Sequence, residues 1–238
     1  MQIAAIIVAG GKGLRMGADT RKQYLKLDGV PILVRTLDAF LSCPKIHRIV
    51  LAAPADDFPF IRSELLSLLP GGDRVVLAAG GAERQESVYS GLKALGTDFK
   101  GLVAVHDGVR PFVSEEEILK VCEAASGCGA AILAVPAFET LKRVSTDGAI
   151  AGTLSRDGLW MAQTPQVFDA GLLCRAHDEA RALGVLGTDD ASLVERLGHP
   201  VEVVAGSRCN IKITTPDDLD LASLFLPRFP LSAENPAG

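Results

Sequence analysis

The residues after the first apolar segment of the chain combine glycines with cations in a pattern suited to phosphate chemistry. The apolar segment ends at Val8, and Arg15 and Lys22 lie a short distance beyond it. Gly10, Gly11 and Gly13 lie between Val8 and Arg15. Glycine leaves backbone N–H groups open to phosphate oxygens, and the two cations add positive charge nearby. The segment therefore predicts a strand that runs into a polyphosphate-binding loop.

The glycine spacing distinguishes this loop from the two commoner phosphate loops. A dinucleotide loop reads G-x-G-x-x-G, but from Gly11 and Gly13 the third glycine would fall on Met16 and instead stands at Gly17. A Walker A loop needs Ser or Thr after Gly-Lys, and here Gly13 follows Lys12. The remaining pattern, G-G-x-G-x-R-M-G, resembles the signature loop of sugar-phosphate nucleotidyltransferases.

Two further segments place glycines and charges after apolar runs. The sequence G-G-A-E-R-Q-E-S contains Gly81, Arg84 and Ser87, which are either a helix cap or contacts to a nucleobase and ribose. The sequence H-D-G-V-R-P contains Asp107 and Arg110. Asp107 is a candidate for holding a substrate hydroxyl or magnesium, and the alternative is a structural ion pair with Arg110.

The chain carries two more candidates near its C-terminal end. Thr188 opens the sequence T-D-D-A-S, where Thr188 or Asp189 can cap a following helix. Lys212 stands in the apolar sequence N-I-K-I-T-T, which predicts a strand. A lysine at this position is either a solubilising residue of an edge strand or a phosphate ligand.

Length and composition exclude several classes of protein. A chain of 238 residues suits one α/β domain. A net charge of −5 argues against a nucleic-acid-binding protein. The N-terminal apolar run is too short to span a membrane and lacks the flanks of a signal peptide, so we expect no membrane association and a cytoplasmic protein. The five scattered cysteines have no C-x-x-C spacing and indicate reduced thiols.

Short apolar runs alternate with amphipathic segments and predict an α/β fold, a Rossmann-like, mostly parallel sheet flanked by helices. The predicted strands are Ile3–Val8, Ile49–Ala53, Val75–Ala78, Leu102–His106, Ala130–Val135 and Val201–Val204. The predicted helices are Pro31–Leu41, Phe58–Leu69, Ser87–Leu95, Ser114–Ala125, Ala170–Leu183, Asp190–Leu197 and Pro216–Phe225.

One polar segment interrupts this alternation. Residues 137–157 contain two β-like stretches around the turn sequence T-D-G, and they predict a projecting β-arm that reaches a partner subunit in a homodimer. We expect residues 1–226 to form a single domain and residues 227–238, rich in proline and small residues, to form a flexible tail.

The ordered motifs together resemble the 2-C-methyl-D-erythritol 4-phosphate cytidylyltransferase family from Ile3 to about Leu226. The most discriminating are E-T-L-K-R, R-D-G-L-W-M-A-Q-T-P-Q-V-F, T-D-D-A-S-L-V-E and N-I-K-I-T-T-P-D-D-L. The chain departs from the family pattern in small ways, at Val8, Ala82 and Gly108-Val109. These departures concern the base pocket more than the chemistry.

The resemblance implies a function and a set of site residues. The reaction would be transfer of CMP from CTP to the methylerythritol phosphate with release of pyrophosphate, in the non-mevalonate isoprenoid precursor pathway. The cofactor would be Mg²⁺, and the sequence does not identify the residues that bind it. The nucleotide would be held by Ala9, Gly10, Gly11, Gly13, Gly81, Arg84 and Ser87, and the catalytic cations would be Arg15, Lys22 and Lys212. The acceptor would be met by Asp107, Arg110 and Thr188 of one subunit and by Thr140 and Arg156 on the arm of the other.

Such a reaction needs no general base. A phosphate monoester has a second pKa of about 6 and is largely ionised at neutral pH, so none of the four histidines has to deprotonate it. The barrier comes from bringing an anion to a triphosphate, which cations reduce. We expect Lys22→Ala and Arg15→Ala to lower kcat on the order of 10²-fold or more.

Several alternative functions compete with this interpretation. A ribitol 5-phosphate cytidylyltransferase shares the glycine loop and the K-I-T-T-P sequence, but E-T-L-K-R and T-D-D-A-S-L-V-E favour the methylerythritol phosphate family. A molybdopterin guanylyltransferase shares a similar loop but not the arm or the late motifs. A non-catalytic nucleotide-binding regulator would not need three cations around one phosphorus, and the glycine spacing disfavours a dehydrogenase.

Overall fold

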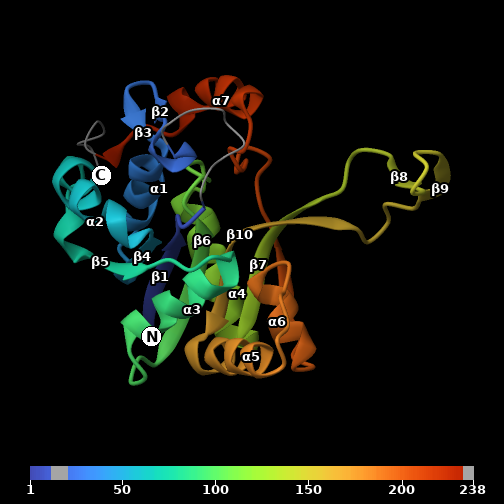
Figure 1. The fold of residues 1–238 in the computed structure, drawn as a ribbon, viewed down its shortest axis with the longest axis horizontal. Coiled ribbons are helices and arrows are strands. Elements are labelled where there is room, and N and C mark those ends of the chain that lie inside the picture. Colours follow the sequence, from blue (N-terminus) through green and yellow to red (C-terminus); the bar gives the residue numbers. More distant parts are fainter. Residues whose placement is uncertain (12–20, 233–238) are drawn as a thin grey trace.

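A seven-stranded sheet forms the centre of the protein, seen here in a computed structural model that describes residues 1–11 and 21–232 (Figure 1). Its strand order is β11-β7-β10-β6-β1-β4-β5. The strands are β1 (Gln2–Val8), β4 (Ile46–Ala53), β5 (Val75–Ala79), β6 (Gly101–Asp107), β7 (Ala130–Pro136), β10 (Trp160–Asp169) and β11 (Glu202–Ala205). All neighbours pair in parallel except β10, which runs antiparallel to β6 and β7. The predicted mostly parallel α/β sheet is confirmed.

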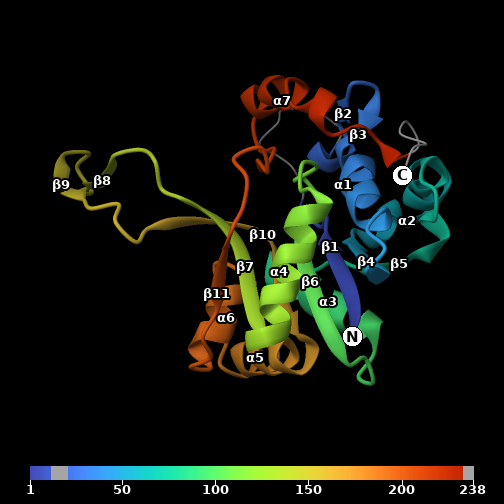
Figure 2. The ribbon, with the colours of Figure 1, turned by 180° about the vertical axis from the view of Figure 1, so that it is seen from behind.

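Helices cover both faces of the sheet (Figures 1 and 2). They are α1 (Ile32–Leu41), α2 (Phe58–Phe60), α3 (Arg84–Leu95), α4 (Glu115–Cys128), α5 (Ala170–Ala182), α6 (Asp190–Arg196) and α7 (Pro216–Ser223). Alternate residues of β1 point to opposite faces. Ala5 and Ile7 join a buried cluster with α1 and α4, whereas Ala4 and Ile6 join one with α3, α5 and α6. A strand buried on both faces explains the continuous apolar run of the sequence.

Helix termini follow local capping chemistry, and one predicted helix is wrong. Ser114 and Glu117 form the expected capping box at the start of α4. Helix α3 begins at Arg84 rather than Ser87, because Glu83 caps it together with Glu86. The predicted helix over residues 58–69 breaks into α2, a π turn (Ile61–Leu65) and a 3₁₀ turn (Leu66–Leu68).

Strand β10 is absent from the sequence predictions because it has no continuous apolar run. Its middle carries Gln163, Thr164, Pro165 and Gln166, and the pairing with β7 shifts register between Ala162 and Gln166. A proline cannot donate to the hydrogen-bond ladder, which explains a break at this point.

The segment that carries Lys212 is irregular, so the strand predicted there is wrong. The backbone N–H of Ile213 donates to the carbonyl of Val109 over 2.9 Å, outside any ladder. Apolar residues in this segment pack against a local cluster rather than into the sheet.

The segment predicted as an arm is a β-hairpin that extends away from the sheet (Figures 1 and 2). Strands β8 (Leu141–Val144) and β9 (Ile150–Leu154) pair antiparallel to each other and not with the central sheet. The turn between them contains Gly148 with φ +85°, a conformation that favours glycine.

The C-terminal segment packs on the domain as far as Ser232, and the flexibility predicted for residues 227–238 stays a prediction. A 3₁₀ helix spans Leu226–Arg228, and the Phe229 ring lies 5.3 Å from that of Phe112. The Ser232 N–H donates to the Asp38 carboxylate over 2.8 Å.

A separate small hairpin joins β2 (Lys26–Leu27) to β3 (Val30–Pro31). None of the helices in the described part of the chain is both long and apolar enough to cross a membrane.

Candidate active site

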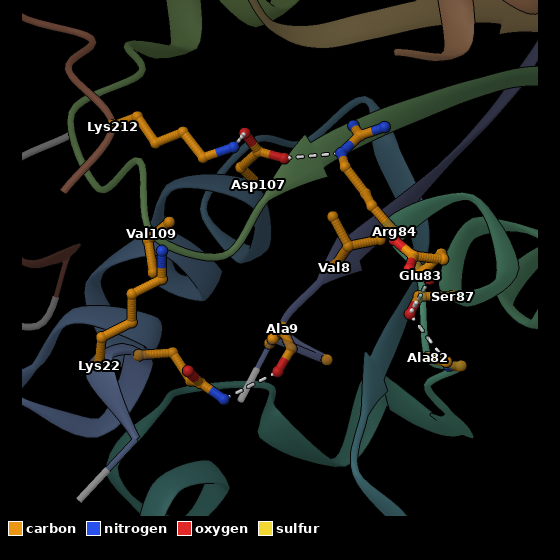
Figure 3. Close-up of a pocket in the computed structure, with 14 residues that line it drawn as sticks. Val8, Ala9, Lys22, Ala82, Glu83, Arg84, Ser87, Asp107, Val109 and Lys212 are labelled. Atoms are coloured by element: carbon orange, nitrogen blue, oxygen red, sulfur yellow. Dashed lines mark hydrogen bonds and ion pairs between the residues drawn. The ribbon is translucent and has the colours of Figure 1, made fainter. Parts of the chain in front are cut away.

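A cavity of about 160 Å³ opens where β1, β5 and β6 reach their C-terminal ends (Figure 3). Carboxyl ends of parallel strands meet at one edge of the sheet, which is where ligands bind in this class of fold. The residues around the cavity are Val8, Ala9, Gly10, Gly11, Lys22, Gln23, Gly81, Ala82, Glu83, Arg84, Ser87, Asp107, Val109 and Lys212.

Close backbone packing forms one wall of this cavity. A Cβ placed on Gly10 would lie 2.9 Å from the Oγ of Ser87 and 3.7 Å from the Cα of Gly80, so the loop after β1 and the turn after β5 pack closely here. The hydroxyl of Ser87 accepts from the backbone N–H of Gly81 at 3.1 Å and donates to the Glu83 carbonyl at 3.2 Å. The glycines leave backbone exposed along this wall, which suits close approach of a phosphate or a nucleoside.

Gln23 connects the turn of Lys22 to the loop after β1. Its side chain is buried, and its amide donates to the Ala9 carbonyl over 2.8 Å. Lys22 begins the short 3₁₀ helix Lys22–Tyr24 that also contains Gln23. The lysine is therefore held beside the glycines by its neighbour in sequence.

Three cations surround the carboxylate of Asp107 at the end of β6. Arg84 Nε lies 3.0 Å from Oδ1 and Lys212 Nζ lies 2.9 Å from Oδ2 (Figure 3). Arg110 Nε lies 3.5 Å from Oδ2. Burial alone would raise the pKa of Asp107, but the cations, Arg84 foremost, lower it well below its ordinary value. Asp107 is therefore an anion throughout the neutral and mildly acidic range.

Arg84 continues the charge network into the body of the protein. Its Nη1 lies 2.6 Å from Asp190 Oδ2, and Asp190 Oδ1 lies 3.1 Å from Nε2 of the buried His177. Burial disfavours the charged guanidinium, but Asp190 and Asp107 outweigh it and raise the pKa of Arg84. The Nη2 atom of Arg84 is buried without a hydrogen-bond partner among the described residues.

A second cavity of about 290 Å³ adjoins the first and shares Arg84, Asp107 and Lys212 with it. Its other lining residues are Arg110, Ala162, Gln163, Thr164, Gln166, Thr188 and Asp189. Hydroxyl, amide and carboxylate groups of this kind bind polyols, whereas glycines and Lys22 in the first cavity suit a polyphosphate. The shared cations lie where two anionic ligands would meet.

The sequence matches the family model of 2-C-methyl-D-erythritol 4-phosphate cytidylyltransferase over residues 3–228. Proteins of that name from Syntrophus aciditrophicus and Geobacter metallireducens are 48% and 47% identical to this chain. The alignments cover 94% and 95% of this chain, and 96% and 98% of the relatives. The chain belongs to the 2-C-methyl-D-erythritol 4-phosphate cytidylyltransferase family.

Solved structures of the 2-C-methyl-D-erythritol 4-phosphate cytidylyltransferase family share this fold. The protein of that name from Francisella tularensis has a TM-score of 0.81 at 37% identity, covering 95% of this chain and 100% of its own. The 4-diphosphocytidyl-2C-methyl-D-erythritol synthase from Anaerococcus prevotii has a TM-score of 0.83 at 36% identity, covering 95% and 96%.

In this member of the cytidylyltransferase family, most of the residues predicted from sequence line the two adjoining cavities. Ala9, Gly10, Gly11, Lys22, Gly81, Arg84, Ser87, Asp107 and Lys212 line the first, and Arg110 and Thr188 line the second. Gly13 and Arg15 lie outside the described residues. Thr140 and Arg156 lie on the arm and line neither cavity of their own subunit. The roles predicted for these residues stay predictions.

Sequence reasoning missed the glutamines of β10 as parts of the site. Gln166 accepts from the backbone N–H groups of Asp190 and Ala191, both at 3.1 Å, and donates to Asp189 Oδ2 at 2.8 Å. It therefore orients Asp190, the partner of Arg84. The Q-T-P-Q sequence contains both glutamines, but their spacing alone does not show that α6 packs against this strand.

His106 is a structural residue and not a base. The carbonyl of Arg110 can only accept, so Nε2, 3.0 Å away, must donate to it, and Nδ1 must accept from the Thr164 hydroxyl at 3.0 Å. The same Thr164 oxygen accepts from the Asp107 N–H at 3.1 Å. Complete burial lowers the pKa of His106 to about 4.

This lowered pKa predicts a loss of stability in mild acid. The unfolded chain takes up the proton near its ordinary pKa of about 6.5, so the contribution of neutral His106 is present above that pH. It falls by about 1.4 kcal/mol per pH unit as the pH drops from about 6 towards the folded pKa. Urea unfolding at pH 7 and pH 5 measures the effect. A His106→Asn variant should show a shallower pH dependence, and parallel curves would contradict the assignment.

Proposed function

We propose that this protein transfers CMP from CTP to 2-C-methyl-D-erythritol 4-phosphate and releases pyrophosphate, in the non-mevalonate route to isoprenoid precursors. The observation that carries the proposal is the family match over residues 3–228. The relatives quoted above are named for the methylerythritol phosphate, which favours it over ribitol 5-phosphate. The two adjoining cavities provide a place for each substrate.

The reaction is a displacement at the α-phosphorus of CTP. An oxygen of the acceptor phosphate forms a bond to this phosphorus, and the bond to the pyrophosphate oxygen breaks. The acceptor phosphate is already ionised at neutral pH, so no proton has to be removed. Lys22 and the glycine backbone would hold the triphosphate in the first cavity, and Lys212 would neutralise charge where the two phosphates meet. Arg15 is proposed for the same task.

Magnesium is proposed as the cofactor. Among the described residues there is no group of three His, Cys, Asp or Glu side chains able to hold a metal ion. Mg²⁺ keeps phosphate oxygens and water as ligands and needs only one or two carboxylates, so its binding would not require such a group. Asp107 is the carboxylate shared by both cavities. When bound, the ion would add positive charge at the triphosphate.

Pyrophosphate release tests this function directly. The purified protein is given CTP and Mg²⁺ with either 2-C-methyl-D-erythritol 4-phosphate or D-ribitol 5-phosphate, and EDTA is added to a parallel sample. Release with the methylerythritol phosphate alone, abolished by EDTA and restored by Mg²⁺, is expected. Release of pyrophosphate only with D-ribitol 5-phosphate would identify the protein as a ribitol 5-phosphate cytidylyltransferase. Release with neither acceptor would favour a non-catalytic nucleotide-binding protein.

A cytoplasmic homodimer is the proposed working form. The arm exposes large apolar side chains, with Val144 56% and Ile150 66% exposed, and Trp160 at its base is 44% exposed. Such side chains on a projecting hairpin suit burial against a second copy of the chain. The five cysteines are all free thiols, which suits a reducing compartment.

In such a dimer the arm residues Thr140 and Arg156 would reach the acceptor in the partner's cavity. Arg156 at present donates through Nη1 to the Phe138 carbonyl over 2.6 Å, which leaves part of its guanidinium for a phosphate. The Arg156→Ala variant should therefore raise the KM for the acceptor and spare the affinity for CTP.

Mixing two defective variants tests whether the arm acts in trans. Lys22→Ala and Arg156→Ala dimers are combined under conditions that exchange subunits. Each mixed dimer would hold one site with both defects and one intact site, so a random mixture should recover about a quarter of the wild-type rate. Activity no higher than the mean of the two variants would place Arg156 in its own subunit's site or outside any site.

A further inference from the structure

Lys212 lies on a segment that has no regular secondary structure. The Gly206 N–H continues the β11–β7 ladder by donating to the Ala134 carbonyl over 2.8 Å, and residues 207–214 then connect β11 to α7 outside the sheet. A strand or helix fixes its residues by a ladder of backbone bonds, and residues 207–214 form none. Yet Lys212 Nζ lies 2.9 Å from Asp107, so other contacts must determine where the lysine is placed.

Two buried side chains hold the start of this segment. The backbone N–H of Ser207 donates to Glu117 Oε1 of α4 over 2.7 Å, and its carbonyl accepts from Gln163 Nε2 of β10 over 2.8 Å. Glu117 is 9% exposed and Gln163 is 7% exposed. Both polar groups of one residue are thus bonded to side chains from the body of the domain.

The same contacts continue to within two residues of the lysine. The carbonyl of Asn210 accepts from Arg110 Nη1 over 2.7 Å and from Gln163 Nε2 over 3.4 Å. The Asn210 side chain, fully buried, donates to the Thr164 carbonyl over 2.8 Å. The amide of Gln163 therefore bridges the segment at two carbonyls, Ser207 and Asn210.

Gly206 shows how closely Gln163 is fitted to the segment. A Cβ on Gly206 would lie only 2.4 Å from Gln163 Oε1. That oxygen is buried and has no hydrogen-bond partner among the described residues. A buried unpaired acceptor is unfavourable, so the packing is explained by what the amide nitrogen does rather than by the oxygen.

We propose that Gln163 is a positioning residue that fixes Lys212 at the junction of the two cavities. The proposal rests on the catalytic role proposed above for Lys212. Gln163 lines the second cavity, but its amide nitrogen donates to the Ser207 and Asn210 carbonyls and its oxygen is buried, so we assign its effect to the backbone of residues 207–210 rather than to contact with a substrate. Loss of Gln163 would then shift the ammonium group of Lys212 by a few tenths of an ångström to about one ångström. Such a shift would reduce kcat although the positive charge of Lys212 is still present.

A double-mutant cycle separates positioning from a general structural role. Gln163→Met keeps the length of the side chain and removes its N–H donors. We expect kcat to fall about tenfold in the wild-type background and less than about twofold in a Lys212→Ala background, because residues that act as a unit are not additive. Gly206→Ala, which displaces Gln163 from the other side, should reproduce the result if Gln163→Met folds poorly. Thermal unfolding of each variant accompanies the assay.

The outcomes of the cycle are distinct from those of the functional assay. Equal losses in both backgrounds, or unchanged kcat in Gln163→Met and Gly206→Ala, would overturn the positioning role. Failure of the proposed function would instead appear as no pyrophosphate release by the unmodified protein. The same cycle can be measured as affinity for CTP by calorimetry, which needs no turnover. If Gln163→Met lowers the affinity for CTP in the wild-type background but not in the Lys212→Ala background, the proposal is supported. An equal loss of affinity in both backgrounds rejects it.

Discussion

Replacement of Lys212 by alanine is expected to lower kcat for pyrophosphate release by about 10²- to 10³-fold, the size of one strong transition-state contact. Lys212 lines both cavities, and its ammonium group lies 2.9 Å from the carboxylate at their junction. In the proposed reaction, charge grows at this junction as the acceptor phosphate approaches the α-phosphorus. Steady-state kinetics with each substrate varied would show the loss mainly in kcat.

Lys45→Ala provides the matched control for Lys212→Ala. Lys45 is exposed and directly precedes β4, so it lies at the opposite end of the strands from the cavities. The substitution removes the same charge from the protein and should leave kcat within a factor of about two, as surface changes usually do. A comparable loss in both variants would assign the effect to net charge, and wild-type turnover in Lys212→Ala would exclude the lysine from catalysis.

Asp107→Asn is expected to reduce both activity and stability. The substitution leaves Arg110 and Lys212 without their carboxylate partner, while Arg84 keeps Asp190. Breaking one partner of a buried ion pair costs about 3–5 kcal/mol, and we expect a loss near the lower end of this range because Arg84 stays paired. We also expect kcat/KM for the acceptor to fall on the order of 10²-fold, since the three cations lose their common anchor.

Urea unfolding and kinetics of Asp107→Asn are compared with those of Asp217→Asn. Asp217 is exposed in the first turn of α7, where loss of a carboxylate costs less than about 1 kcal/mol. Because the cations lower the pKa of Asp107, its contribution to stability is present above the ordinary carboxyl pKa and is lost only in strong acid. If the free energies of unfolding of the wild-type protein and Asp107→Asn became equal between pH 7 and pH 5, this assignment would be contradicted.

The sequence predicted six of the seven strands of the central sheet and the part of the site that local patterns determine. Apolar runs such as Ile3–Val8 are buried on both faces, and their lengths and spacing are visible without a structure. Glycines and charges that directly follow such runs must meet at one edge of a parallel sheet. The association of Gly10, Gly81 and Asp107 around one cavity follows from this rule.

Residues whose place depends on tertiary contacts were not predictable in this way. Gln163 and Gln166 lie on a polar, proline-containing strand that has no apolar signature, and their partners are 23 to 47 residues away in sequence. The strand expected around Lys212 is absent because its apolar neighbours pack in a local cluster instead of the sheet. Local propensity cannot show whether an apolar residue packs into the central sheet or into a separate local cluster.

The antiparallel strand β10 joins the arm to the second cavity along one continuous length of chain. Figure 2 shows β10 running from the arm into the sheet. The strand begins at Trp160 and reaches Gln163 after only three residues. An insertion or deletion between them would move the hairpin and flip the faces of the cavity-lining residues at once. The exposed turn at Gly148 has no such constraint. A change of length at the tip of the hairpin therefore leaves the register of β10 intact, whereas a change at its root does not.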